Sequence, residues 1–148
     1  MSEEWKSDPK VHFVTNPDGK QMWFRLCPAK VNPESAPIYL ILHGHGTTSR
    51  PTLYAEKNWN IIAPLDNFGL DGKGSWWIGE NGDFSTRELL ASVVQKSKDL
   101  LGSNDDVILC IYGSSMGGYG AIISIKNTPP KRGSRPPKTY LCNSQTFL

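Results

Sequence analysis

The residues with the clearest potential for chemistry lie in the stretch from Val107 to Ala121, which reads VILCIYGSSMGGYGA. An apolar run leads into GSSMG at 113–117, and small or apolar residues follow, so we predict a strand, a sharp turn and a helix. The turn matches GxSxG, a pattern in which the central serine stands at a strained strand-to-helix turn with an exposed hydroxyl. Glycines on either side have no Cβ and let the strand and the helix approach closely. This nucleophile-elbow pattern makes Ser115 a candidate catalytic nucleophile.

A second glycine-rich segment, HGHGTT at 43–48, follows the apolar run Ile38–Leu42. The run is typical of a strand that is buried on both faces of a parallel sheet. A glycine-rich loop after such a strand can present one backbone N–H to a developing oxyanion, and the residue after the nucleophile can present the other. We therefore expect His45 and Met116 to be oxyanion donors through their main chains. We interpret His43 as a residue that stabilises the turn.

The GxSxG motif alone does not decide the chemistry, because its fixed positions recur by chance in about 5% of chains of this length. A glycine-rich turn of a nucleotide-binding unit and a plain loop are the structural alternatives at 113–117. The paired histidines of the HGHG segment suggest a metal site, but no nearby cysteine or further histidine completes a coordination shell. We expect neither a metal nor another cofactor.

The composition is that of a single globular domain, because 148 residues with 38% hydrophobic and 20% charged side chains can bury a substantial core. A net charge of +2 is too small to indicate nucleic-acid binding. The chain has no apolar run near about 18 residues and no apolar signal region at its start, so we expect a cytoplasmic protein without a membrane partner. The cysteines lack metal-ligand spacing, and we interpret them as structural or free thiols rather than as a disulfide framework.

The elements that must position the two motifs can be assigned in chain order. Strand-like runs flank the turn NPDG at 16–19 and predict a β-hairpin, and a short parallel strand is expected at 59–64. Between 85 and 101, apolar residues repeat at helical spacing after STRE, which has the pattern of a capping box, and Gly102 supplies a stop. We expect a second helix to run from the serine turn to about Lys126.

A long irregular segment with five glycines, Leu65 to Asp83, precedes the first predicted helix. Loops of this length without regular structure are commonly functional. Trp76 and Trp77 are candidate substrate-binding residues that would wall a pocket; the alternative is that they pack over the sheet edge. The acidic residues of the segment are interpreted as solvated loop charges: Asp66, Asp71 and Glu80.

The character of the sequence changes after the second predicted helix. Prolines interleave with lysines and arginines between 129 and 138, a composition that no packed element favours. We predict a disordered tail over 128–148. A PxxP ligand or a basic nucleic-acid patch is the alternative interpretation of this segment.

The order of these features resembles an α/β-hydrolase of the esterase and lipase-like branch. The features are the hairpin, the HGHG loop, the strand that ends in AP, the helix at 85–101 and GSSMGGYGA. The resemblance covers one partial domain at 10–127, and it implies an α/β fold with a mostly parallel sheet, an N-terminal β-hairpin and flanking helices. It also implies that Ser115 is the nucleophile, that His45 and Met116 are the oxyanion donors, and that the substrate is a small-molecule ester.

The chain departs from the family pattern after the serine. The family order is nucleophile, acid and then histidine, yet no histidine, aspartate or glutamate follows Ser115, and the three histidines lie at positions 12, 43 and 45. Removing the base of such a triad lowers turnover on the order of a millionfold. The sequence therefore predicts an esterase-type serine hydrolase, or a truncated fragment of one that is weakly active or inactive.

The absence of the family's later strands from this sequence also affects the expected self-association of the chain. Without the family's later strands, the run at 107–112 would form an apolar sheet edge that favours self-association. The simplest account is the N-terminal half of a hydrolase followed by a tail that is foreign to the fold. A non-catalytic binding or interaction protein and an acyltransferase that uses the same serine are the alternatives.

Overall fold

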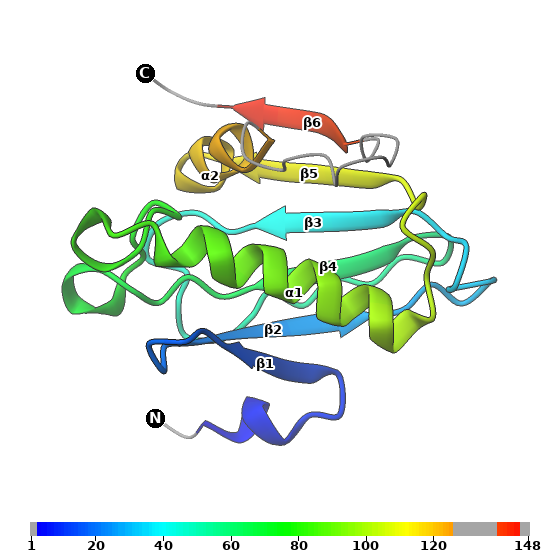
Figure 1. Cartoon of the computed structure of the whole chain (residues 1–148), viewed down its shortest axis with the longest axis horizontal. Coiled ribbons are helices and arrows are strands. Elements are labelled where there is room, and N and C mark those ends of the chain that lie inside the picture. The colour runs from blue at the N-terminus through cyan, green and yellow to red at the C-terminus, as the bar shows by residue number, and fades with distance from the viewer. Residues whose placement is uncertain (1–2, 126–138, 146–148) are drawn as a thin grey trace.

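The computed structural model describes residues 3–125 and 139–145, in which helices cover one face of a mixed sheet (Figure 1). The strands lie in the order β1-β2-β4-β3-β5-β6. Their bounds are β1 (Val11–Thr15), β2 (Gln21–Cys27), β3 (Ile38–Leu42), β4 (Asn60–Pro64), β5 (Leu109–Ser114) and β6 (Thr139–Gln145). The helices are α1 (Ser85–Leu101) and α2 (Met116–Ile125), with short 3-10 turns η1 (Glu4–Ser7), η2 (Leu70–Gly72) and η3 (Glu80–Gly82).

The sheet confirms the expected α/β class. The first strands, β1 and β2, form the predicted hairpin, and β2 continues antiparallel to β4. The strands β4, β3, β5 and β6 are parallel neighbours. The sheet is therefore mixed, and its parallel part carries the strand ends from which the two glycine-rich segments leave.

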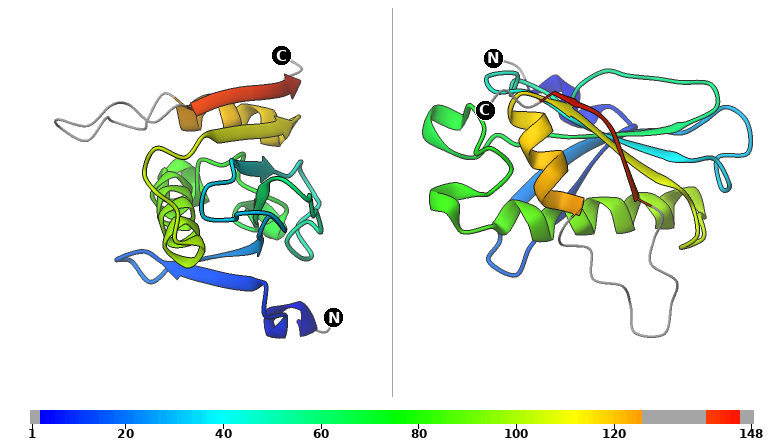
Figure 2. Two further views of the ribbon diagram at one scale, coloured as in Figure 1. Left: turned by 90° about the vertical axis from the view of Figure 1, so that its right-hand side faces the viewer. Right: turned by 90° about the horizontal axis from the view of Figure 1, so that it is seen from above.

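Both helices pack on the same face of the sheet (Figure 2). Alternate residues of β3, namely Ile38, Leu40 and Leu42, are at most 2% exposed and join one core cluster with Val93 of α1 and Met116 of α2. This alternation follows from the two-residue repeat of a strand, which sends successive side chains to opposite faces. Neither helix of the described residues is long and apolar enough to cross a membrane.

Among the described residues, no α-helix lies over the opposite face of the sheet (Figure 2). The connection between β3 and β4 lies on this side and contains no helical residue (Figure 2). Half-buried aromatic rings meet here: Tyr39 contacts Trp59 edge-on with 5.2 Å between ring centroids, and it stacks near Tyr112 at 6.3 Å. Loop residues and aromatic rings therefore cover this face in place of a helix.

Strand β6 corrects the expectation of an open sheet edge at 107–112. The strand β5 is flanked by β3 on one side and by β6 on the other. Residues 139–145 belong to the stretch 128–148 that the composition predicts to be a disordered tail, and they form a strand instead. The segment TYLCNSQ contains β-branched and aromatic residues that suit a strand, and it satisfies backbone groups of β5 that would otherwise be unpaired. The other tail residues lie outside those described.

Helix α1 ends where the sequence predicts but starts differently. The residue that caps its N-terminus is Phe84, which has a φ of 59° and makes no side-chain cap bond, and Ser85 is already helical. The capping-box prediction is therefore wrong, and the Asp83 carboxylate accepts the Ser85 N–H at 3.0 Å. Gly102, with a φ of 67°, ends the helix as expected.

The cysteines follow the sequence interpretation only in part. Cys27 at the end of β2 is a buried free thiol. Cys110 in β5 is disulfide-bonded, whereas the spacing of the cysteines favours structural or free thiols. The spacing of the cysteines in the sequence does not predict this bond.

Candidate functional site

Ser115 makes the turn between β5 and α2 by itself, since β5 ends at Ser114 and α2 begins at Met116. Its φ of 54° lies in the left-handed region, which costs a non-glycine residue about 1 to 2 kcal/mol. The Ser115 side chain is exposed, and its carbonyl accepts the Tyr119 N–H at 3.1 Å to begin the helix. The turn thus presents a hydroxyl to solvent at the N-terminus of a helix.

Close backbone approach explains the glycines on either side of this serine. A Cβ at Gly113 would clash with the carbonyl group of Gly117. A Cβ at Gly117 would clash with the Leu42 carbonyl oxygen and would lie 3.0 Å from the oxygen of His43. Glycine at these positions therefore lets α2 pack against both β5 and the end of β3, which is the steric reason that the motif implies.

The two glycine-rich segments lie side by side at one end of the sheet, where its parallel strands have their carboxyl termini. The strands β3 and β5 are parallel neighbours with Leu42 opposite Gly113, so the HGHG segment and the serine turn leave the sheet at the same end. A Cβ built on Gly44 would lie 4.0 Å from the Ser114 carbonyl oxygen. Ligands of open parallel sheets bind outside the carboxyl ends of the strands, where these segments meet.

His43 is a buried ring with both nitrogens engaged. It is 6% exposed, its Nε2 accepts the Asp66 N–H at 2.8 Å, and its Nδ1 lies 2.8 Å from the Gly44 carbonyl oxygen. Because Nε2 accepts, the hydrogen of the neutral ring is on Nδ1 and is donated to Gly44. Burial lowers the pKa of His43, and the hydrogen bond to Gly44 and the charge of Asp66 act in the opposite direction. The ring therefore stabilises the turn and has no free nitrogen that could take a proton from Ser115.

Asp66 belongs to the site region, although the sequence suggests a solvated charge. It is 0% exposed, and its carboxylate accepts the N–H groups of Ser75 and Trp77 at 2.9 Å each. The Ser75 hydroxyl adds a bond of 2.9 Å. These bonds fold the long loop back onto the end of β4. The position of Asp66, just past the carboxyl end of a parallel strand, is the signal that could have identified it.

The two tryptophans of the long loop have different environments. Trp77 is 0% exposed and packs into the core, where its ring lies 4.9 Å from the His43 ring between centroids. Trp76 is 46% exposed, and its ring meets Tyr119 of α2 at 6.2 Å. Trp77 therefore fills the core in this structure, and Trp76 is the ring that remains accessible near the serine turn.

The residues predicted as oxyanion donors lie in the two segments that leave the same end of the sheet, and no histidine hydrogen-bonds to the serine within the described residues. His45 is exposed in the HGHG segment, and Met116 is the first residue of α2 with a fully buried side chain. The remaining histidine, His12, lies on β1, where burial lowers its pKa. Across the part of the chain that the structure describes, the Ser115 hydroxyl makes no hydrogen bond to a histidine. Nor do three metal-ligating side chains gather within this part.

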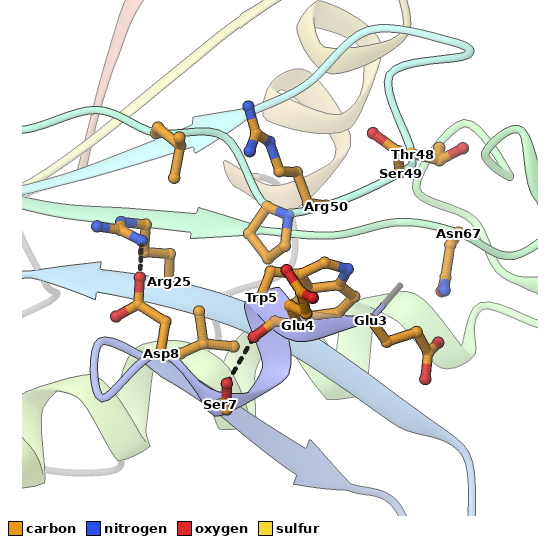
Figure 3. A pocket seen from close by; sticks show the side chains of 13 residues that line it. Glu3, Glu4, Trp5, Ser7, Asp8, Arg25, Thr48, Ser49, Arg50 and Asn67 are labelled. Atoms are coloured by element: carbon orange, nitrogen blue, oxygen red, sulfur yellow. Dashed lines mark hydrogen bonds and ion pairs between the residues drawn. The ribbon is translucent and has the colours of Figure 1, made fainter. Parts of the chain in front are cut away.

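A surface groove lies away from these residues, between the N-terminal turn η1 and the connection from β3 to β4 (Figure 3). Glu3 and Glu4, at the start of η1, line one side, and Arg50 lies across from them. Ser115, His45 and Met116 do not line this groove. It is therefore separate from the serine turn.

Comparison with known proteins gives matches only at the level of structure: no family model and no curated protein matches the chain. An S-formylglutathione hydrolase from Agrobacterium tumefaciens superposes with a TM-score of 0.54 at 20% identity, over 79% of this chain and 52% of the other. A thermostable esterase superposes with a TM-score of 0.50 at 21% identity, over 80% of this chain and 37% of the other. A capsule O-acetyltransferase of Neisseria meningitidis serogroup A superposes with a TM-score of 0.51 at 18% identity, over 79% of this chain and 50% of the other.

These likenesses concern the fold, because the sequence identities are low. The chain spans about half the length of these solved structures, or less. The structure of this chain therefore resembles part of an α/β-hydrolase fold.

Proposed function

We propose that this chain carries the nucleophile and the oxyanion donors of an esterase-type serine hydrolase that acts on a small-molecule ester. The observation that supports this most directly is the left-handed, exposed Ser115 at a strand-to-helix junction beside the HGHG segment. A hydroxyl placed in this way is accessible to a carbonyl carbon. The main-chain N–H groups of His45 and Met116 are the proposed oxyanion donors.

The proposed reaction begins when the Ser115 oxygen bonds to the ester carbonyl carbon and loses its proton. The carbonyl oxygen becomes an oxyanion, which collapses to break the bond to the leaving alcohol, and the alcohol takes up a proton. Water then hydrolyses the acyl-enzyme. Since His43 has both ring nitrogens engaged and no histidine hydrogen-bonds to the Ser115 hydroxyl within the described residues, we expect slow acylation and very slow turnover.

An activated phosphonate tests the nucleophile without requiring turnover. We expect a fluorophosphonate probe to label the folded chain once, at Ser115, as read by intact mass and peptide mapping. The variant Ser115→Ala should not be labelled. The matched control is Ser114→Ala, since Ser114 is also exposed and precedes the turn. Labelling that persists in Ser115→Ala, or a folded wild type that takes no label, would refute the proposal.

Acyl transfer is the second candidate. The structural likeness to a capsule O-acetyltransferase favours it, and so does the exposed Trp76 ring, since aromatic rings can stack on sugars. The same acyl-serine would then react with a hydroxyl of a sugar instead of water. Incubating the acylated protein with and without an oligosaccharide distinguishes the two: transfer predicts an acylated sugar, and hydrolysis predicts free acid only.

A further inference from the structure

The Gly44 carbonyl receives two hydrogen bonds from side chains that flank it. The His43 Nδ1 lies 2.8 Å from this oxygen, and the Thr47 hydroxyl donates to it at 2.8 Å. The Thr47 oxygen is also 3.5 Å from Nδ1, so the groups form one compact cluster. A carbonyl oxygen has two lone pairs, and both are engaged here.

This cluster fixes the orientation of the next N–H. The peptide between Gly44 and His45 is trans, as are all peptide bonds of the described residues, so its C=O and N–H point in opposite directions. Holding the carbonyl toward His43 and Thr47 therefore turns the His45 N–H away from both. Within residues 3–125 and 139–145, no backbone acceptor engages this N–H.

The side chain and the main chain of His43 are held in place by Asp66 and Trp77. The Asp66 N–H donates to Nε2 at 2.8 Å, the Trp77 ring packs at 4.9 Å between centroids, and the Trp77 Nε1 donates to the His43 carbonyl at 3.4 Å. Farther along the turn, the Gly46 N–H donates to the Lys73 carbonyl at 2.9 Å. The long loop thus supports the ring that orients the Gly44 carbonyl.

We propose that the His43 ring and the Thr47 hydroxyl are positioning groups that hold the Gly44–His45 peptide so that its N–H faces the oxyanion formed at Ser115. This inference rests on the proposed function, because the reaction at Ser115 supplies its kinetic readout. Neither side chain touches the substrate. Their effect passes through one peptide group, whose orientation decides whether an oxyanion is stabilised.

Thr47 offers the cleaner variant, because its side chain is exposed and its loss leaves the core intact. Thr47→Val keeps the shape and removes the donor, and we expect fluorophosphonate labelling of Ser115 to slow about fivefold. Thr47→Ser restores the hydroxyl and should label at the wild-type rate. Urea unfolding should hardly differ among these variants, because the substituted side chain is exposed. If Thr47 had only a structural role, Thr47→Val would therefore be labelled at the wild-type rate.

The two hydrogen bonds of the His43 ring can be tested separately. His43→Asn places an amide N–H near the position of Nδ1 and keeps a donor for Gly44, whereas His43→Gln places an oxygen near Nε2 and keeps an acceptor for Asp66. We expect His43→Gln to label about a hundredfold more slowly than wild type, and His43→Asn to label faster than His43→Gln at equal folded fraction. A reversed order would overturn the inference.

A measurement that needs no chemistry separates this inference from the proposed function. Nitrogen NMR of the His43 ring should show the Nδ1–H tautomer, and the carbonyl-carbon signal of Gly44 should shift in Thr47→Val but not in Thr47→Ser. A wild type that takes no label would refute the proposed function and, with it, the role in positioning. A labelled wild type with unaffected Thr47→Val and His43→Gln, or an Nε2–H tautomer, would overturn the inference alone.

Discussion

His43 makes this site sensitive to pH, because only a neutral ring can accept the Asp66 N–H at Nε2. Protonation would place a second N–H against that donor and would leave a charge in a side chain that is 6% exposed. Burial accordingly lowers the pKa of His43 below its ordinary value of 6.5. At the residue scale, the same hydrogen bonds that orient the turn therefore also stabilise the fold.

The sign of this pH dependence follows from proton binding. Below pH 6.5 the unfolded chain binds a proton at His43 before the folded chain does, so stability falls as the pH drops below 6.5 and through the lower folded-state pKa. We expect the free energy of urea unfolding to decrease over this window in wild type and to vary less in His43→Gln. The lowered pKa of His12 contributes in both proteins and cancels in the comparison. Equal slopes for the two proteins would contradict the prediction.

At the scale of elements, the site depends on how tightly α2 packs onto the ends of β3 and β5. The glycines at 113 and 117 leave no space for a Cβ, and the obstructing atoms are backbone atoms that cannot move aside as a side chain could. The serine turn and α2 can therefore pack on the ends of β3 and β5 in one arrangement only. The position of Ser115 is set by this docking rather than by contacts of its own side chain.

Gly117→Ala tests this docking. The added Cβ would clash with the Leu42 carbonyl, and we expect a loss of about 3 kcal/mol in the free energy of unfolding, or failure to fold. Gly44→Ala is the control, because the nearest atom to its Cβ would be 4.0 Å away and its φ is not positive. Chemical denaturation followed by circular dichroism measures both, and equal stability of the two variants would show that the packing is looser than described.

At the scale of the whole molecule, pairing with β6 determines whether β5 is an edge strand of the sheet. The strand β5 is almost continuously apolar, and an unpaired strand of this kind templates association. A chain that stops at residue 127 lacks β6, and we expect it to associate more strongly than the full chain in sedimentation velocity. Removing 146–148 alone leaves β6 intact and should change nothing. Identical sedimentation of the two shortened chains would argue against the pairing.

The sequence predicts the parts of this molecule that depend on neighbouring residues. GSSMG and HGHG each follow an apolar strand, so local pattern places Ser115 and His45 at strand ends. It does not place β6, because a proline-rich stretch precedes it and its partner is about thirty residues away in the chain. The solvated charge predicted for Asp66 and the capping box predicted at Ser85 are wrong for the same reason: the burial of Asp66 and the left-handed cap at Phe84 depend on the folded loop.

The left-handed backbone at Ser115 has a cost that any glycine would avoid. A chain selected only for durability would gain from placing glycine there, since the strain of about 1 kcal/mol would vanish. The hydroxyl and the resilience of the fold therefore impose opposite demands on one position, and the serine found there weakens the protein in order to expose an oxygen.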